Sequence, residues 1–257
     1  MDETSGSGEW CWFIAEIVAT SKNVDANGKY AMRKESALFY APSVEESYDK
    51  AERLGHRRYP ATQEPVSRDL GEETGQQSRL EFLGVWNFRE IFGDAPEDGV
   101  ELTWYEEELS PADLGSRVRA RDDLSVFQVA SQPATGWYIA EVVLEEVHDE
   151  GSHGDHVLVW VNFHLIAAAD ASAAYQRAQE VGARYTEELG SHKCDGEKAH
   201  WVFIGLQDLY PCMMAPGDER VLWSEDFLAT AAARAERVPT REQEFHRFKN
   251  PGRALDD

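Results

Sequence analysis

The sequence predicts an α+β fold made of two repeated β-β-α-β-β modules, whose antiparallel sheets are each covered by a helix and packed as a pseudo-symmetric pair. The first observation behind this prediction is self-similarity, because Trp12–Val18 recurs as Trp137–Val143, 125 positions later. The second is that three more matching blocks follow in the same order, at offsets of 119 to 127. They are Ser47–Ala51 with Ala174–Ala178, Phe82–Val85 with Phe203–Leu206, and Trp104–Leu109 with Trp223–Leu228. Collinear repetition of this kind indicates an internal duplication.

The matching blocks also define the domain organisation. We place the first repeat module at residues 9–109 and the second at residues 136–237. Residues 110–135 form a connector between them, and residues 238–257 form a polar C-terminal tail.

Each module opens with a predicted β-hairpin. Trp12–Val18 is rich in aromatic and β-branched residues, which is typical of a strand covered on both faces. A polar, glycine-containing stretch and a second apolar run follow, as in hairpins. These segments are 23–29 and 36–40 in the first module, and 148–155 and 157–163 in the second. Because one helix cannot cover both faces of a sheet, we expect the two modules to pack together, either face to face or as one continuous sheet.

A helix follows each hairpin. Ser43 with Glu46 three residues later has the form of a capping box, and Asp170 is the equivalent cap in the second module. Gly55 and Gly182 stand where these helices are expected to end. A third strand is predicted at 80–88 and 201–209, and a short fourth strand ends at Trp104 or Trp223.

The charge of the chain is strongly negative in both halves. With 25 Lys and Arg against 48 Asp and Glu over 257 residues, the formal net charge is −23. Residues 1–125 carry 14 basic and 26 acidic side chains, and residues 126–257 carry 11 and 22. A surface of this sign repels phosphate groups, so we expect no nucleic-acid or membrane partner, and it favours a basic protein. The alternative is that the acidity serves solubility alone.

Cysteine usage and hydropathy predict a cytoplasmic protein. Cys11, Cys194 and Cys212 are an odd count without a Cys-x-x-Cys pair, which fits a reducing compartment. No apolar run approaches the roughly 18 residues of a membrane span. The acidic start of the sequence lacks the basic region followed by an apolar region that is typical of a secretion signal.

Several of the repeated segments resemble a bacterial family designated domain of unknown function 4288. The resemblance rests on Trp137–Glu141, the helix around Tyr175, Phe203–Tyr210 and the late acidic strand, and it is closer in the second copy, over residues 136–230. The first copy departs from it, with Trp86-Asn87-Phe88 where the second reads Gln207-Asp208-Leu209. The resemblance implies tandem copies of that domain, and it supplies no catalytic residue, substrate or cofactor.

The first candidate site is a carboxylate within each opening strand. Alternation along a strand places Glu16 on the face of Trp12, and Glu141 on the face of Trp137. A carboxyl group beside aromatic side chains can lose solvent and acquire a raised pKa, as a general acid or a ligand-binding group requires. The alternative is a Glu paired with Arg or exposed at a strand edge.

The second candidate site is acidic and follows the late tryptophans. An aromatic side chain surrounded by carboxylates suits a basic partner, whereas an ordinary solvated strand end is the alternative. The predicted partner-binding residues are Trp104, Glu106, Glu107, Trp223, Glu225 and Asp226.

The sequence offers little for metal or cofactor chemistry. The loop His148–His156 holds imidazoles and carboxylates without a fixed ligand spacing, and the first module has no histidine there. No phosphate-binding glycine loop, dinucleotide fingerprint or nucleophile elbow is present in the sequence. We therefore assign no catalytic residue, no metal and no cofactor.

Two functional hypotheses follow, from different classes. The first is a non-enzymatic, acidic interaction protein that binds a basic protein, as an immunity protein binds a toxin. The second is a small-molecule-binding protein or an enzyme, with a pocket near Glu16 or Glu141. A purely architectural pair of modules is a third reading.

Overall fold

A computed structural model describes residues 10–61, 80–91, 96–97, 100–128, 136–148, 157–194, 197–217 and 220–230. The predicted C-terminal tail at 238–257 lies outside these residues. The first half contains β1 (Cys11–Val24), β2 (Tyr30–Ala41), α1 (Val44–Arg58), β3 (Leu80–Ile91) and β4 (Glu101–Leu109). The connector holds α2 (Pro111–Arg117), η1 (Arg121–Asp123) and α3 (Ser125–Gln128). The second half contains β5 (Trp137–His148), β6 (Val157–Ala167), α4 (Ala171–Leu189), β7 (Ser191–Cys194), β8 (Glu197–Pro211) and β9 (Arg220–Ala229).

The chain divides into two compact units, each built around one sheet. Unit 1 comprises Met1–Glu90 with Pro216–Asp257, and unit 2 comprises Ile91–Ala215. The described strands confirm an α+β fold in two parts, with antiparallel pairing in both sheets. Among the described residues, no helix is long and apolar enough to cross a membrane.

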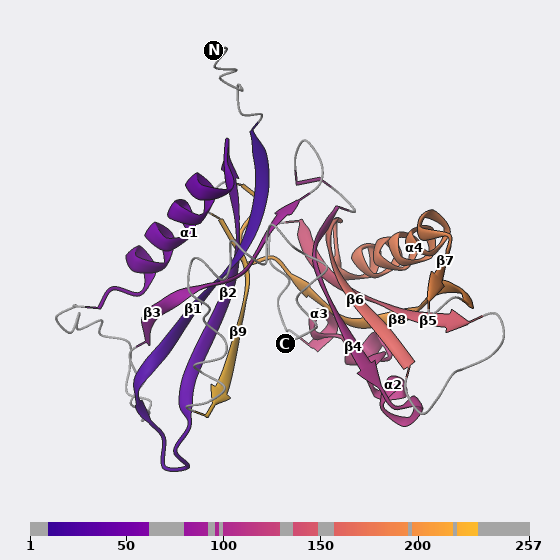
Figure 1. Cartoon of the computed structure of the whole chain (residues 1–257), viewed down its shortest axis with the longest axis horizontal. Coiled ribbons are helices and arrows are strands. Elements are labelled where there is room, and N and C mark those ends of the chain that lie inside the picture. The colour runs from indigo at the N-terminus through magenta and orange to yellow at the C-terminus, as the bar shows by residue number, and fades with distance from the viewer. Residues whose placement is uncertain are drawn as a thin grey trace. The chain divides into compact units, whose positions relative to one another are not determined.

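Unit 1 is a four-stranded sheet in the order β3-β1-β2-β9 (Figure 1). The predicted hairpin is confirmed, since β1 and β2 pair antiparallel with Glu16 opposite Ser36. Alternate residues of β1 point toward α1 and form its core. The members of this core include Phe13, Ala15, Ile17, Phe39, Tyr48, Ala51 and Leu54. The Ser43 hydroxyl caps α1 by accepting a hydrogen bond from the Glu46 amide, as predicted.

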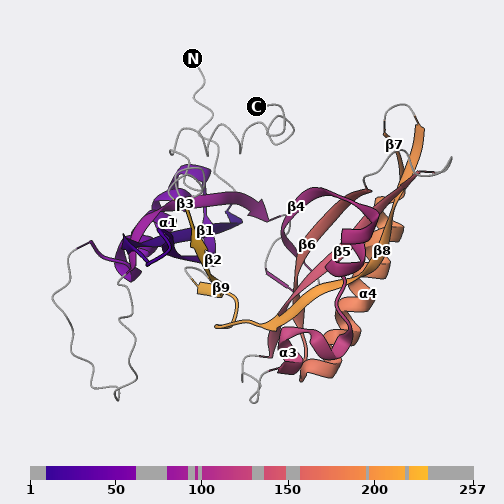
Figure 2. The ribbon, with the colours of Figure 1, turned by 90° about the horizontal axis from the view of Figure 1, so that it is seen from below.

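Unit 2 is a five-stranded sheet in the order β4-β6-β5-β8-β7. α4 lies along one face of this sheet (Figure 2). Its core joins alternate residues of β5 to the small residues of the helix, and includes Tyr138, Ala140, Val142, Leu144, Ala174, Ala178 and Val181. Asp170 caps α4 through the amide of Ala173, at 2.9 Å.

The fourth strands are exchanged between the repeats. β4, from the end of the first repeat, pairs with β6 in unit 2, and β9, from the end of the second repeat, pairs with β2 in unit 1. In Figure 1 the late strand β9 lies beside the early strand β2. The prediction that each repeat builds its own four-stranded sheet is therefore wrong for these strands. A hydrophobic pattern identifies a strand but does not name its partner.

Two further predictions need correction or stay open. Gly55 and Gly182 do not end their helices, since both lie inside α1 and α4. A Cβ atom at Gly55 would lie 2.2 Å from the Phe82 ring, and one at Gly182 would lie 2.5 Å from the Phe203 ring. Both glycines therefore allow an aromatic side chain of the third strand to approach the helix. The described strands form two separate sheets rather than one continuous sheet, and the packing of the modules against one another stays a prediction.

Candidate functional site

The strongest candidate site surrounds Glu141 on the face of the unit 2 sheet opposite α4. Its neighbours Ala140 and Val142 point into the α4 core, so alternation directs Glu141 to the other face. Val143 shares that face and packs with Val159 and Val161. The Glu141 side chain is half-buried in this largely apolar surface.

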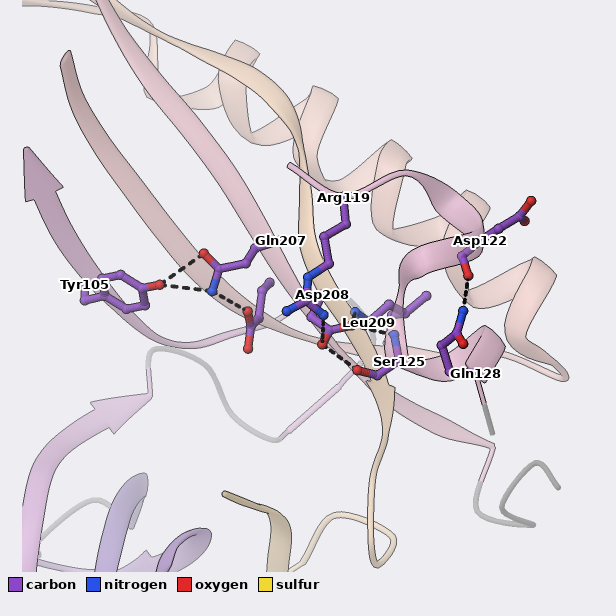
Figure 3. A network of polar contacts seen from close by, with 9 residues as sticks. Tyr105, Arg119, Asp122, Ser125, Gln128, Gln207, Asp208 and Leu209 are labelled. Atoms are coloured by element: carbon purple, nitrogen blue, oxygen red, sulfur yellow. Dashed lines mark hydrogen bonds and ion pairs between the residues drawn. The ribbon is translucent and has the colours of Figure 1, made fainter. Parts of the chain in front are cut away.

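A β-bulge in β8 presents Gln207 to Glu141. Glu141 lies opposite Asp208 and Val142 lies opposite Leu206, so Gln207 is the extra residue of the bulged strand. Such an insertion redirects a side chain. The Gln207 Nε2 donates to Glu141 Oε2 at 2.7 Å and also lies 3.1 Å from the Tyr105 hydroxyl (Figure 3).

The exchanged strand completes this site. Tyr105 belongs to β4, and its hydroxyl is 3.3 Å from the Gln207 Oε1. Glu141 and Gln207 fall in the second predicted repeat, residues 136–237, whereas Tyr105 falls in the first, residues 9–109. Tyr105 therefore reaches this cluster because β4 pairs with β6 in unit 2.

The surroundings of Glu141 raise the pKa of its carboxyl group toward neutral pH. Burial, with the nearby charge of Asp208, raises the pKa of Glu141 to about 7, against hydrogen bonds from Gln207 and Tyr210 and the positive charge of Arg119. Burial and the Glu141 carboxylate likewise raise the pKa of the Tyr210 hydroxyl. Among the described residues, no Lys or Arg forms an ion pair with Glu141. At neutral pH this carboxyl can therefore donate or accept a proton.

Asp208 holds the connector beside the site, and its carboxylate is bound by connector residues. Its carboxylate accepts from the amide of Ser125 at 2.7 Å and from the Ser125 hydroxyl at 2.6 Å, and it pairs with Arg119 at 2.9 Å (Figure 3). Gly205, at φ 148°, allows Val118 to approach, because a Cβ there would lie 2.3 Å from the Val118 side chain. The connector is thus fixed against β8.

Unit 1 holds an equivalent cluster, but a lysine fills it. Lys34 Nζ lies 3.3 Å from Glu16 Oε1 and 3.3 Å from Glu225 Oε2. Lys34 also lies 5.8 Å from the centre of the Trp86 ring. Burial raises the pKa of Glu16, and the Lys34 charge opposes that effect. The predicted carboxylate of unit 1 is therefore part of an internal ion pair.

The predicted tryptophans stand nearer the start of the opening strands than the carboxylates. Trp12 packs on Tyr40 with ring centroids 4.9 Å apart. It stands four residues from Glu16, and Trp137 stands four residues from Glu141, which is about 13 Å along a strand. Around the carboxylates the structure places residues that the sequence did not identify as site residues: Tyr105, Gln207 and Tyr210 in unit 2, and Lys34 and Trp86 in unit 1.

The predicted partner-binding residues are mostly engaged within their sheets. Trp104 stacks on Trp160 with centroids 5.4 Å apart, and Trp160 Nε1 donates to Glu106. Glu107 pairs with Arg117. In unit 1, Trp223 is buried and Glu225 pairs with Lys34, while the side chain of Asp226 lies outside the described residues.

Metal chemistry gains no support from the described residues, which include no group of three or more His, Cys, Asp or Glu side chains placed to bind a metal. His148 and His192 approach the buried Glu146 carboxylate at 3.4 and 2.5 Å. The rest of the predicted loop, residues 149–156, lies outside the part of the chain that the structure describes.

The fold and the site together define an internally duplicated α+β protein in which each compact unit carries a strand from both repeats. The chain belongs to the family described as Domain of unknown function (DUF4288), whose model matches residues 12–104 and 137–222. This match confirms the tandem copies inferred from the repeated blocks. Comparison with curated proteins and with solved structures gave no match.

Proposed function

We propose that this protein is a binding protein that recognises a basic protein partner, and that unit 2 contacts this partner at the Glu141 cluster. The supporting observation is an unequal charge. Ile91–Ala215 contains 7 basic and 23 acidic residues, a net charge of −16. Unit 1 contains 18 and 25, a net charge of −7. The difference is not visible between residues 1–125 and 126–257, because the two compact units divide the chain after residues 90 and 215 instead.

The local chemistry points the same way. Glu141 is partly exposed, and the nearby Arg119 lowers its pKa through its charge without an ion pair to it among the described residues. A cation from a ligand would give the ionised carboxylate a direct ion-pair partner. The negative field of unit 2 would speed the approach of a basic protein and would weaken as salt is added.

Isothermal titration of the full-length protein with a lysine-rich and an arginine-rich peptide of equal length tests the proposal. We expect binding that weakens at least tenfold when salt rises from about 50 to about 300 mM. Glu141→Gln should weaken binding at least tenfold. Glu180→Gln on α4 removes the same charge from an exposed residue and should change affinity less than twofold. Equal effects of the two variants, or no binding of either peptide, would contradict the proposal.

A second candidate function is small-molecule binding or catalysis with Glu141 as a general acid or base. The specific observation in its favour is the pKa of Glu141 of about 7, which suits proton transfer at neutral pH. Thermal-shift screening of metabolites on the wild type and Glu141→Gln would support it if a compound stabilises only the wild type. A cytoplasmic location stays part of the proposal, supported by the odd number of cysteines and the lack of a Cys-x-x-Cys pair in the sequence.

A further inference from the structure

The two clusters occupy equivalent positions in the two units. Glu16 corresponds to Glu141, and each lies on the first strand of its hairpin, opposite Ser36 or Phe163. Lys34 lies two residues before Ser36 on β2, and Val161 lies two residues before Phe163 on β6, so Lys34 corresponds to Val161.

The exchanged strands keep the same correspondence. Glu225 of β9 lies opposite Lys34, and Tyr105 of β4 lies opposite Val161. In the third strand, Trp86 stands at the position of Gln207 in the matching block. Glu16 and Glu141 are therefore surrounded by equivalent strands that carry different side chains.

In unit 1 these positions form a site for an ammonium group. The Lys34 ammonium bridges two carboxylates, from Glu16 and Glu225, and lies near the face of Trp86. Two anionic acceptors and an aromatic ring are the groups that stabilise a partly desolvated ammonium. The chain fills this site with its own side chain.

In unit 2 the carboxylate is kept and the ammonium is missing. Val161 is fully buried and carries no charge, and Tyr105 replaces the second carboxylate. Gln207 Nε2 lies within hydrogen-bond distance of Glu141 Oε2 and the Tyr105 hydroxyl and holds both in place. Tyr210 also hydrogen-bonds the Glu141 carboxyl group. The acceptors that remain are the other lone pairs of the Glu141 carboxylate and a lone pair of the Tyr105 oxygen.

We infer that the Glu141 cluster of unit 2 binds the primary ammonium group of a ligand, which is the group that Lys34 supplies in unit 1. This inference rests on the proposed function and names the chemical group that the partner presents. An ammonium fits better than a guanidinium, because a guanidinium binds best when both oxygens of a carboxylate are free. Gln207 already occupies one oxygen of Glu141.

Binding is linked to the proton on Glu141. An ammonium needs the ionised carboxylate, so affinity rises as pH increases from 6 to 8. The other charged and titratable groups around Glu141 are Asp208, Arg119, Tyr210 and Tyr105, and Glu107 with Arg117 lies near Tyr105. The two tyrosines stay protonated over this range, because burial raises the pKa of both.

The test is an NMR titration of the full-length protein with n-butylammonium, using n-butylguanidinium as the matched comparator at constant ionic strength. We expect saturable shifts at Glu141, Tyr105 and Gln207, at least fivefold tighter binding of the ammonium than of the guanidinium, and tighter binding at pH 8 than at pH 6. Glu141→Gln should abolish the shifts. Equal binding of both cations, or binding by Glu141→Gln, would overturn the inference.

Two variants exchange the properties of the clusters. Val161→Lys introduces an internal ammonium and should prevent butylammonium binding in unit 2. Because Val161 is buried, this variant can fail to fold, and Lys34→Met in unit 1 then serves as the second test. Removing the internal ammonium should create a second butylammonium site beside Glu16. A folded Val161→Lys that binds as well as the wild type, or a Lys34→Met without the added site, would count against the inference.

Comparing peptides with butylammonium identifies which kind of ligand carries the ammonium group. It also distinguishes failure of this inference from failure of the proposed function. A lysine peptide that binds more tightly than butylammonium identifies a protein side chain, whereas equal affinity identifies a small amine. If the arginine-rich peptide binds and ammonium ligands do not, the inference fails and the proposed function stands. If no cation binds, both fail.

Discussion

Unit 1 and unit 2 are built from copies of one module, but they differ in how the equivalent carboxylates Glu16 and Glu141 are paired. Unit 1 pairs Glu16 with Lys34, and it pairs the buried Glu35 with Arg58 through two hydrogen bonds of 2.5 and 2.7 Å. Unit 2 places Val161 and Asn162 at the positions of Lys34 and Glu35. Unit 1 therefore pairs its buried carboxylates with internal cations, whereas in unit 2 no Lys or Arg of the described residues forms an ion pair with Glu141.

The largest expected effect comes from breaking the Glu35–Arg58 pair. Glu35 is only 1% exposed, so Arg58→Met leaves a buried carboxylate without its partner and should destabilise the protein by about 3 kcal/mol. Urea unfolding of the full-length protein measures the change.

Asn162→Leu is the matched variant in unit 2. Neither polar atom of the buried Asn162 side chain has a hydrogen-bond partner within the part of the chain that the structure describes, so this change should be neutral or stabilising by about 1 kcal/mol. A destabilisation of Asn162→Leu as large as that of Arg58→Met would contradict the contrast between the units.

The second prediction concerns a feature that the two units share. Gly55→Ala and Gly182→Ala should each destabilise by about 1–3 kcal/mol, because the new methyl group would overlap the Phe82 or Phe203 ring. The loss should exceed the gain of about 1 kcal/mol in helix propensity.

Gly115→Ala in α2 is the control for these helix glycines. Beyond its own helix, no atom of the described residues lies within 4 Å of its added Cβ, so Gly115→Ala should not lower the melting temperature. A rise in melting temperature for Gly55→Ala or Gly182→Ala would show that the rings move away at little cost.

A smaller effect is expected in the pH dependence of stability. The folded pKa of Glu141 lies near 7, above its ordinary value of 4.5, so its contribution is present below pH 4.5 and is lost as pH rises through 7. The Glu141→Gln side chain cannot ionise, so the variant should gain stability relative to the wild type as the pH rises. The difference in unfolding free energy between variant and wild type should increase by about 1–2 kcal/mol from pH 5 to pH 8. Urea unfolding at the two pH values checks this, and parallel changes in both proteins would contradict it.

The sequence predicted the duplication, the hairpins and both helix caps because these features depend on local patterns. It also identified Glu16 and Glu141, since a carboxylate within an apolar strand is visible in the pattern itself. The exchange of β4 and β9 was not predictable, because equivalent repeats offer equivalent partners for a fourth strand.

The neighbours of Glu141 escaped prediction for a related reason. Gln207 reaches it only through a bulge, and Tyr105 only through the exchanged strand. One signal was available for Lys34, since alternation places it on the same face of β2 as the buried Met32 and Leu38. A lysine at such a position indicates an internal carboxylate partner.

The most direct test of the central claim is an NMR titration of the side-chain carboxyl carbon of Glu141 in the full-length protein, alone and with saturating n-butylammonium. The contrast between a filled and an open cluster predicts a midpoint near pH 7 for the free protein, and a midpoint at least one pH unit lower when the ammonium is bound. A free midpoint near 4.5, or one that the ammonium leaves unchanged, would show that Glu141 is an ordinary solvated carboxylate and that unit 2 has no open cation site.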